Sequence, residues 1–337
     1  MIRRLLAAAL TLALGLVLLV AVWPQLFHLE WSPVVAQVVS MRGVAIAVAA
    51  VGVIFLAILG TVSASARRLT GSLALLLVVF CVASLAVLAS RGFGNTNFSD
   101  RMNSDITVLS WNTLGDAPGA RAIADLALDS GAQVLTLPET SEATGAEVAA
   151  LMTAAGSPMW AATVAFDEIS KARSTTLLIS TDLGGYTVQP SYGNTSTLPT
   201  VVATPDDGSG PIIVAVHPVA PVPALLESWR DDMGWLSNLC AEGNMIMAGD
   251  FNSTLDHWGR VSAGPGNALG NCQDAAAATG NAAVGTWPST LPALLGTPID
   301  HVLYTKNWTA TGMRVVQDLD DLGSDHRAIV VQLTTAG

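Results

Sequence analysis

The chain has 337 residues, of which 51% are hydrophobic and 12% are charged. Soluble domains carry about 25% charged residues, so this composition excludes an ordinary single soluble domain. The sequence holds 15 Lys and Arg residues against 26 Asp and Glu residues, a formal net charge of −11. Its three cysteines are too few for a disulfide-rich scaffold.

The first 90 residues contain three uncharged apolar runs that are long enough to cross a bilayer. The runs cover residues 5–23, 43–62 and 71–90. An α-helix rises 1.5 Å per residue, so about 20 residues cross the hydrocarbon layer of roughly 30 Å. We therefore predict three transmembrane helices that form an anchor over residues 1–90.

Basic residues flank these runs unevenly. Arg3 and Arg4 precede the first run, and Arg67 and Arg68 lie between the second and the third. Because loops rich in Lys and Arg stay in the cytoplasm, everything after residue 90 is expected to lie outside it. The first run also fits a cleavable signal peptide, although no small-x-small site precedes the break at 23–24. Cleavage would leave this orientation unchanged.

The remaining residues divide into a short linker and an acidic domain. Residues 91–104 contain few apolar side chains and are expected to form a tether. The chain after residue 90 carries 10 basic and 25 acidic groups, a formal balance of −15. Its richness in Ala, Gly and Val is typical of bacteria, so we expect a multi-pass protein of a bacterial cell membrane with its domain at 105–337 outside the cytoplasm.

Short apolar runs that suit β-strands alternate with helical patterns along the acidic domain, which predicts an α/β or α+β fold. Two stretches rich in Gly, Pro, Ser and Asn, at 192–199 and 263–271, are longer than ordinary connections and are expected to be functional loops. The expected helices cover residues 120–129 and 225–239, and the expected strands cover residues 106–110, 133–137, 175–180, 212–216, 245–248, 302–304 and 328–333.

Two of the three cysteines, Cys240 and Cys272, belong to the acidic domain. Disulfides persist outside the cytoplasm, so the predicted topology favours a bridge between these two residues. Two unpaired buried thiols are the alternative.

Polar side chains with catalytic chemistry stand at the ends of six expected strands. Strand ends hold side chains rigidly at the rim of a sheet, so we expect one site there. Carboxylates without a thiolate cluster suit Mg²⁺ or Mn²⁺ rather than structural zinc, and such an ion with a histidine predicts hydrolysis of a phosphate ester. The six segments are 110–113, 137–140, 216–218, 249–252, 299–302 and 324–326.

Each segment alone also has an ordinary structural interpretation, since Gly249 to Asn252 fits a turn and Trp111 fits core packing. In this order, however, the six segments resemble the endonuclease/exonuclease/phosphatase superfamily, which includes DNase I, inositol polyphosphate 5-phosphatases and neutral sphingomyelinases. Residues 286–288, Thr-Trp-Pro, are similar to a stretch in members of that group. The resemblance implies a four-layer sandwich, in which two central β-sheets are flanked by helices and the site lies at the strand ends.

The resemblance also implies a metal site. Glu139 matches the principal ligand of the Mg²⁺ or Mn²⁺ ion, Asn112 matches a second residue of that site, and Asp325 matches an additional metal-site carboxylate.

Five further residues match the superfamily's catalytic positions. Asp250 matches the residue that orients or deprotonates the attacking water, and Asn252 matches the one that holds the phosphate. Asp300 matches the carboxylate that orients the terminal histidine, His326. His217 matches a histidine that contacts the scissile phosphate or the leaving oxygen in the nuclease, sphingomyelinase and 5-phosphatase branches.

Other motifs in the domain point to no further chemistry. His301 is expected to be structural, and nothing in the spacing of His257 requires it to touch substrate. No G-x-S-x-G nucleophile elbow and no C-x-x-C pair occurs in the sequence.

Charge bears on the substrate, because nucleases hold phosphates mainly through Lys and Arg. The domain has no basic run, and Lys171 and Arg173 form its closest basic pair. Our first hypothesis is therefore a membrane-anchored phosphodiesterase or phosphatase that acts on a lipid head group or another envelope phosphate ester. An anchored extracellular nuclease and a catalytically silent membrane scaffold are the alternatives.

Overall fold

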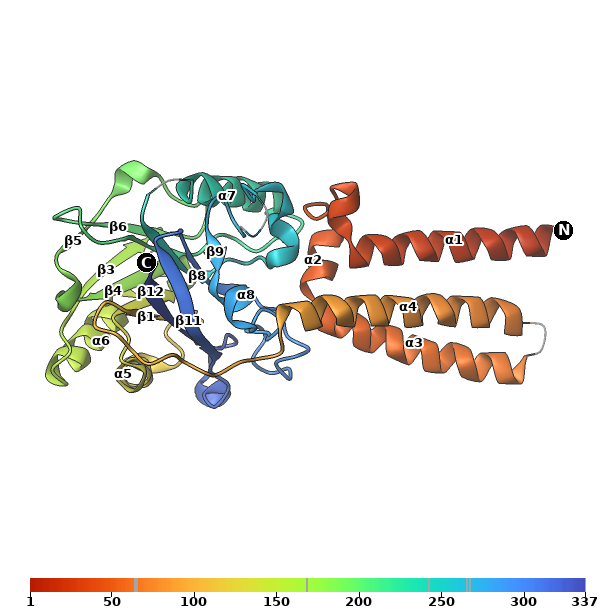
Figure 1. Ribbon diagram of the computed structural model, residues 1–337, viewed down its shortest axis with the longest axis horizontal. Coiled ribbons are helices and arrows are strands. Elements are labelled where there is room, and N and C mark those ends of the chain that lie inside the picture. The colour runs from red at the N-terminus through yellow and green to blue at the C-terminus, as the bar shows by residue number, and fades with distance from the viewer. Residues whose placement is uncertain (64–65, 168, 242, 265, 267, 337) are drawn as a thin grey trace. The chain divides into compact units, whose positions relative to one another are not determined.

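The computed structural model describes all residues except 64–65, 168, 242, 265, 267 and 337. It divides the chain into two compact units, Met1–Ser90 and Arg91–Gly337 (Figure 1).

The first unit is helical. Three of its helices are long and apolar enough to cross a membrane, as the apolar runs predicted. The third begins four residues before the expected run, because Arg67 and Arg68 are good helix formers and continue its N-terminus. The long helices are α1 (Ile2–Val22), α3 (Arg42–Val62) and α4 (Arg67–Arg91), and the short ones are η1 (Pro24–Phe27) and α2 (Val35–Ser40).

The second unit contains two six-stranded sheets packed face to face. The first sheet has the order β11 (Trp308–Val315), β12 (Ile329–Thr335), β1 (Ile106–Ser110), β2 (Val134–Pro138), β4 (Ser174–Ser180) and β3 (Met159–Ala165). The second sheet has the order β5 (Tyr186–Val188), β6 (Val201–Pro205), β7 (Ile212–Val216), β8 (Met245–Asp250), β10 (Asp300–Tyr304) and β9 (Gln273–Asp274).

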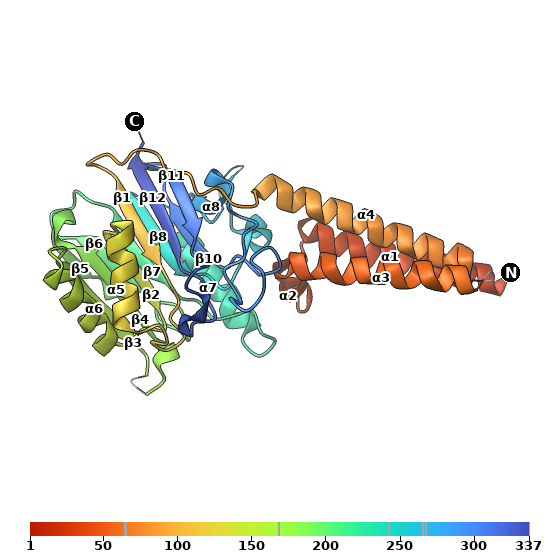
Figure 2. The ribbon, with the colours of Figure 1, turned by 90° about the horizontal axis from the view of Figure 1, so that it is seen from below.

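Helices complete the sandwich on both outer sides. Helices α5 (Gly119–Ser130) and α6 (Glu142–Ala154) cover the first sheet, and α7 (Leu226–Leu239) lies along the second (Figures 1 and 2). Both sheets are mixed, because β1 with β2 and β7 with β8 are parallel while the other pairs are antiparallel. The expected four-layer fold is confirmed. The shorter helical elements are α8 (Ala275–Thr279), η2 (Lys171–Arg173), η3 (Thr181–Leu183), η4 (Pro190–Tyr192), η5 (Leu255–Arg260) and η6 (Asp320–Leu322).

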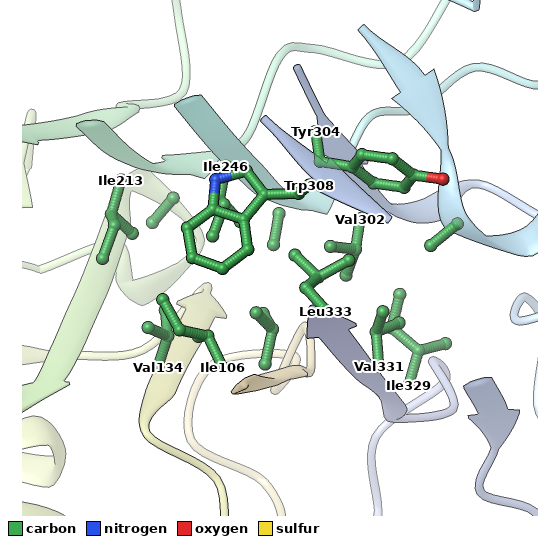
Figure 3. Close-up of a cluster of buried hydrophobic side chains, with 14 of the residues drawn as sticks. Ile106, Val134, Ile213, Ile246, Val302, Tyr304, Trp308, Ile329, Val331 and Leu333 are labelled. Carbon is green, nitrogen blue, oxygen red and sulfur yellow. The ribbon is translucent and has the colours of Figure 1, made fainter. Parts of the chain in front are cut away.

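The main core lies between the two sheets. Figure 3 shows side chains such as Val134 and Val331 of the first sheet facing Ile213 and Ile246 of the second. The next residue along each strand points to the opposite face, where Leu135 packs under α5 and α6. Both faces of the central strands are therefore buried, which explains why these strands are continuous apolar runs in the sequence.

The segment between the two units has neither helix nor strand over residues 92–104. It is nevertheless held to the domain by hydrogen bonds. The Gly94 amide donates to the Gly280 carbonyl at 3.1 Å, and the Ser99 amide donates to the Thr311 carbonyl at 3.1 Å. The expected tether thus follows the surface of the domain before it enters β1.

The structure joins Cys240, at the end of α7, to Cys272, directly before β9, with their Cα atoms 5.9 Å apart. Both residues are fully buried. The bridge closes a segment of 32 residues that includes β8 and η5.

Replacing both cysteines with serine is expected to lower the free energy of unfolding by about 3 kcal/mol, since the bridge restricts the unfolded chain over this long loop. The measurement is denaturant unfolding of both proteins without reductant. A matching loss should follow when dithiothreitol is added to the wild type, and an insensitive wild type would show that the thiols are free.

Candidate active site

The polar segments converge because of the strand directions. Strands β1, β2, β7 and β8 end at one edge of the sandwich, and β10 and β12 begin at that same edge. Asn112 and Glu139 therefore follow β1 and β2, while His217 follows β7. Asp250 ends β8 opposite Asp300, the first residue of β10.

An amide and two carboxylates form the centre of the cluster. The Asn112 Nδ2 atom donates to Glu139 Oε1 at 3.2 Å and to Asp250 Oδ2 at 3.1 Å. Its Oδ1 atom accepts from the Leu114 amide at 3.0 Å. Asn112 thus links one residue from each sheet and fixes the separation of their carboxylates.

A histidine and a carboxylate form the second part of the cluster. The Nδ1 atom of His326 lies 2.9 Å from Asp300 Oδ2, and its Nε2 atom lies 3.7 Å from Asp250 Oδ2. The Trp111 indole donates to the His326 carbonyl at 2.9 Å. The ring is held from both sides, with Nε2 turned toward Asp250.

Asn252 lies beside Asp250 and is tied to it by its backbone. Its amide donates to Asp250 Oδ1 at 2.8 Å, and its Nδ2 atom donates to Asp250 Oδ2 at 3.2 Å and to the Pro218 carbonyl at 3.0 Å. Asn252 and Glu139 both have left-handed backbones, with φ of 45° and 57°. Each turns the chain sharply at the end of its strand, so the side chain points back into the cluster.

His217 is almost fully buried, with 1% of its surface exposed. Its Nε2 atom lies 3.9 Å from Glu139 Oε1, and its Nδ1 atom is buried without a hydrogen-bond partner among the described residues. Burial, together with the positive charge of His326, lowers the pKa of His217 to about 3. The ring is therefore neutral at physiological pH and has one nitrogen free to donate or accept.

Asp325 contributes a carboxylate from the segment before β12. Its Oδ2 atom accepts from the Trp287 indole at 2.8 Å, whereas its Oδ1 atom is buried without a partner in the described structure. Burial raises the pKa of Glu139, the Asn112 amide and the charge of His326 oppose that rise, and the negative charge of Asp325 adds to it. Glu139 and Asp325 therefore interact with one another electrostatically.

Asp250 and Asp300 form the second pair of carboxylates, and here too a neighbouring negative charge raises a pKa. Burial raises the pKa of Asp250 to about 7, with a further contribution from the charge of Asp300, while His326 works against it. Burial alone would lower the pKa of His326, but the Asp300 and Asp250 carboxylates outweigh it and raise that pKa to about 10. His326 is thus an imidazolium at neutral pH.

This cluster suits a divalent cation. Four carboxylates, those of Glu139, Asp250, Asp300 and Asp325, share the site with one imidazolium, which leaves an excess of negative charge in a buried place. In the described part of the chain, Asp250, Asp300 and His326 have potential ligand atoms within 4.8 Å of one another and could hold a metal ion. The oxygen donors favour Mg²⁺ or Mn²⁺ over zinc.

The predicted metal set differs from this triad. Asn112, Glu139 and Asp325 are the expected ligands of the ion, and Asn112 and His326 both approach the same oxygen of Asp250, Oδ2, so the two sets meet at that residue. In the triad, the Nδ1 atom of His326 is already paired with Asp300. Each set contains one buried carboxylate oxygen without a partner in the described structure, Asp325 Oδ1 in the expected set and Asp300 Oδ1 in the triad.

Some supporting residues had no predicted role. The Ser324 hydroxyl donates to the Asn112 carbonyl at 2.6 Å and accepts from the His326 amide at 3.0 Å. The Thr286 hydroxyl accepts from the Asp300 amide at 3.2 Å. These residues lie within or beside segments that the sequence analysis singles out, but Ser324 also contacts Asn112, 212 residues away, and Thr286 contacts Asp300, 14 residues away, so spacing alone could not show these contacts.

Trp287 offers a test of the Asp325 carboxylate. The Trp287→Phe variant loses the indole donor to Asp325 and is expected to weaken metal binding by about 10-fold to 100-fold, as for other partners of metal ligands. The measurement is the Mg²⁺ dependence of hydrolysis, with metal binding by calorimetry. Trp235→Phe is the control, because the Trp235 indole donates to the Tyr192 carbonyl outside the cluster. Equal metal affinities in all three proteins would remove Asp325 from the metal site.

Comparisons with known proteins agree with this geometry. Residues 109–326 match the sequence family described as the Endonuclease/Exonuclease/phosphatase family. An endonuclease/exonuclease/phosphatase from Beutenbergia cavernae DSM 12333 is similar over 70% of this chain and 72% of its own, with 19% identity and a TM-score of 0.53. A search of curated proteins finds no match.

Two further solved structures are similar in fold. A humanized D. rerio TDP2 matches over 69% of this chain and 100% of its own, with 17% identity and a TM-score of 0.52. The 3′ phosphatase NExo from Neisseria, bound to a product DNA hairpin, matches over 67% of this chain and 98% of its own, with 15% identity and a TM-score of 0.50. Identities this low support the shared fold and nothing more specific.

Proposed function

Because this chain belongs to the Endonuclease/Exonuclease/phosphatase family, whose members are generally phosphoesterases and nucleases, we propose that it is a metal-dependent phosphoesterase. One observation carries the proposal. Asp250 joins the Asn112 and Glu139 pair to the His326 and Asp300 pair, because Asn112 and His326 both approach its Oδ2 atom.

Each residue has a step that it can perform. Asp250 accepts hydrogen bonds from Asn112 and Asn252, and it takes the proton of the attacking water as the new P–O bond forms. The imidazolium of His326, oriented by Asp300, binds a phosphoryl oxygen at Nε2. The neutral His217 ring can donate a hydrogen bond to the leaving oxygen as the ester P–O bond breaks, and that oxygen then takes from solvent a proton equivalent to the one that Asp250 accepted and later releases.

Enzymes of this family typically use divalent metal ions. Glu139, with Asn112 and Asp325, would hold a Mg²⁺ or Mn²⁺ ion, which when bound polarises a phosphoryl oxygen and neutralises charge on the leaving group. The unpartnered Oδ1 atom of Asp325 supports this placement.

We further propose that the enzyme is anchored in a bacterial cell membrane, with its catalytic domain outside the cytoplasm. Three apolar helices could span a membrane, and Arg3, Arg4, Arg67 and Arg68 favour this orientation. The substrate would then be a lipid head group or another envelope phosphate ester. A reporter fused after residue 337 should be active only outside the cytoplasm.

A nuclease is the second candidate, because one similar structure holds a product DNA hairpin. The formal balance of −15 in the residues after the anchor opposes it, since DNA binding depends on converging cations. A silent scaffold is a weaker candidate, because Glu139, Asp250 and His326 are all present.

The experiment uses the full chain in detergent with Mg²⁺. Its substrates are bis-p-nitrophenyl phosphate, p-nitrophenyl phosphate, a bilayer of phosphatidylcholine with sphingomyelin, and duplex and single-stranded DNA. Metal-dependent hydrolysis of either small ester supports a phosphoesterase, and the lipid and DNA arms separate the two candidates. Absence of metal-dependent hydrolysis on every substrate would contradict the proposed function.

A further inference from the structure

Among the described residues after Ser90, seven of the ten exposed large apolar side chains lie at one end of the sandwich, and the other three, Phe93, Phe98 and Met102, lie on the segment before β1. Of the seven, those on loops of the first sheet are Leu114, Phe166, Ile169 and Leu322. On loops of the second sheet they are Tyr192, Val222 and Leu294. We call these seven residues the apolar rim.

Strand directions place every rim residue at the active-site end. Leu114 follows β1 by four residues, and Val222 lies on the loop after β7. Phe166 and Ile169 belong to the loop between β3 and β4, whose paired ends, Ala165 and Ser174, are at the same edge. The remaining three residues lie on the loops that lead into β6, β10 and β12.

The opposite end of the sandwich is different. Among the described residues of its loops at 155–158, 181–185, 206–211 and 305–307, no large apolar side chain is exposed, and Met102, on the segment that enters β1, is the one such residue near this end. Exposed charged residues such as Asp182, Asp207 and Lys306 lie there instead. In Figure 2, β3 and β4 reach the lower part of the domain, whereas β12 extends to its upper edge.

Ile169 is the most prominent member of the rim, because 94% of its surface is exposed. Its amide and that of Ser170 donate to Asp167 Oδ1 at 2.8 and 3.2 Å. This turn directs an aliphatic side chain into solvent, so burying it against an apolar surface would be favourable.

The rim loops offer few free cations for a polyanion. Lys171 pairs with Asp116 at 3.0 Å, and the Arg173 Nε atom donates to the Thr197 carbonyl at 3.4 Å. Arg327 is 3% exposed and is engaged by Asp320. The end of the domain that receives the substrate is therefore apolar rather than basic.

We infer that the apolar rim docks on a lipid surface, so that the phosphate of a lipid reaches the cluster at Asp250. The inference rests on the proposed function and narrows its substrate to a phosphate ester embedded in a bilayer. A bilayer is the expected partner of the rim because the same chain has three helices able to span one, and only 14 residues separate the last of them, α4, from β1. Acidic groups such as Asp321 on the same loops favour a zwitterionic surface over an anionic one.

The first test measures contact with lipid and needs no catalysis. The free Cys81 is replaced by serine in the full chain, and a nitrobenzoxadiazole label is attached to Ile169→Cys. Nanodiscs of phosphatidylcholine with doxyl-labelled phosphatidylcholine supply the quencher. The label at 169 should be quenched about twofold more strongly than the same label on Lys306→Cys at the opposite end. Equal quenching at the two positions would overturn the inference.

The second test compares two phosphodiesters. The double variant Ile169→Ser with Leu294→Ser should lower the ratio of kcat/KM on long-chain phosphatidylcholine to that on bis-p-nitrophenyl phosphate by about tenfold. Met102→Ser is the matched control, because Met102 is 54% exposed on the linker and not on the rim, and it should keep the wild-type ratio. An unchanged ratio in the double variant would contradict docking of the apolar rim on lipid. If neither ester is hydrolysed, the proposed function fails, and quenching still decides the lipid contact.

Discussion

The Asp250→Asn variant is expected to lose about 100-fold to 10,000-fold in kcat on bis-p-nitrophenyl phosphate, because it removes the group that takes the proton of water. Asparagine has nearly the same shape, and its one oxygen can still accept from the Nδ2 atoms of Asn112 and Asn252, while its amide nitrogen replaces the oxygen that accepts from the Asn252 backbone amide. The main effect should therefore appear in kcat, with a smaller change in the melting temperature from the one lost hydrogen bond. Steady-state kinetics and thermal unfolding of the same samples provide the measurement.

Asp207→Asn serves as the control for that variant. Asp207 is an exposed carboxylate in the turn between β6 and β7, at the end of the sandwich away from the cluster. It should retain wild-type kcat. A similar kcat for the Asp250→Asn variant and the wild type would assign water activation to another group, with His326 the next to test.

Removal of divalent ions is expected to abolish hydrolysis, and Mg²⁺ or Mn²⁺ should restore it. Glu139→Gln should lower kcat/KM by about 100-fold at a fixed metal concentration, since electrostatic stabilisation by a metal contributes several kcal/mol. Part of this loss should be recovered at high Mg²⁺, because the Asn112 and Asp325 positions remain. The measurement is a metal titration of activity after chelation.

Glu147→Gln is the matched control, because Glu147 is an exposed carboxylate on α6, which covers the same sheet. It should respond to Mg²⁺ as the wild type does. Full activity of the wild type in excess chelator would exclude a divalent ion from the reaction.

Burial decided which strands the sequence could predict. Strands β1 and β7 are buried along almost their whole length, and their apolar runs were predicted with the correct bounds. Strand β3 is an edge strand with several half-buried Ala and Thr residues, and β11 is interrupted by a register shift at Gly312. The sequence analysis predicted neither strand, because β11 has no continuous apolar run, and β3, although apolar at every position except Thr163, is rich in Ala, which is depleted in strands.

Helix α6 was also missed, for a related reason. Its sequence is rich in Ala and has Gly145 where the helix packs closely against Thr176, so its apolar face is weak. One sequence feature could have indicated this helix, because Ser141 is a favoured N-cap residue. In the structure its hydroxyl accepts a hydrogen bond from the Thr144 amide and caps the helix. Helix α7, with Trp229 and Met233 on its buried face, was predicted to within one residue.

The members of the cluster and the pair of Asp300 with His326 could be predicted from the family resemblance, but the other contacts of the cluster could not. Motif segments at strand ends pointed to Glu139, Asp250 and His326. The hydrogen bonds of Asn112 to the two carboxylates, and that of the Trp287 indole to Asp325, join residues far apart in the chain. They depend on how the two sheets pack, which the sequence does not show. Residues 265 and 267 of the expected loop at 263–271 lie outside the described residues.

The left-handed backbones at Glu139 and Asn252 have a consequence for the evolution of this domain. A residue other than glycine in this region costs about 1 kcal/mol, so each position trades folding stability for a side chain aimed at the phosphate. Selection for thermal tolerance alone would favour glycine at both turns and would remove two side chains of the cluster. If these side chains act as proposed, stability-guided redesign of this protein must keep both turns fixed, because the sequence that relieves the strain would lose activity.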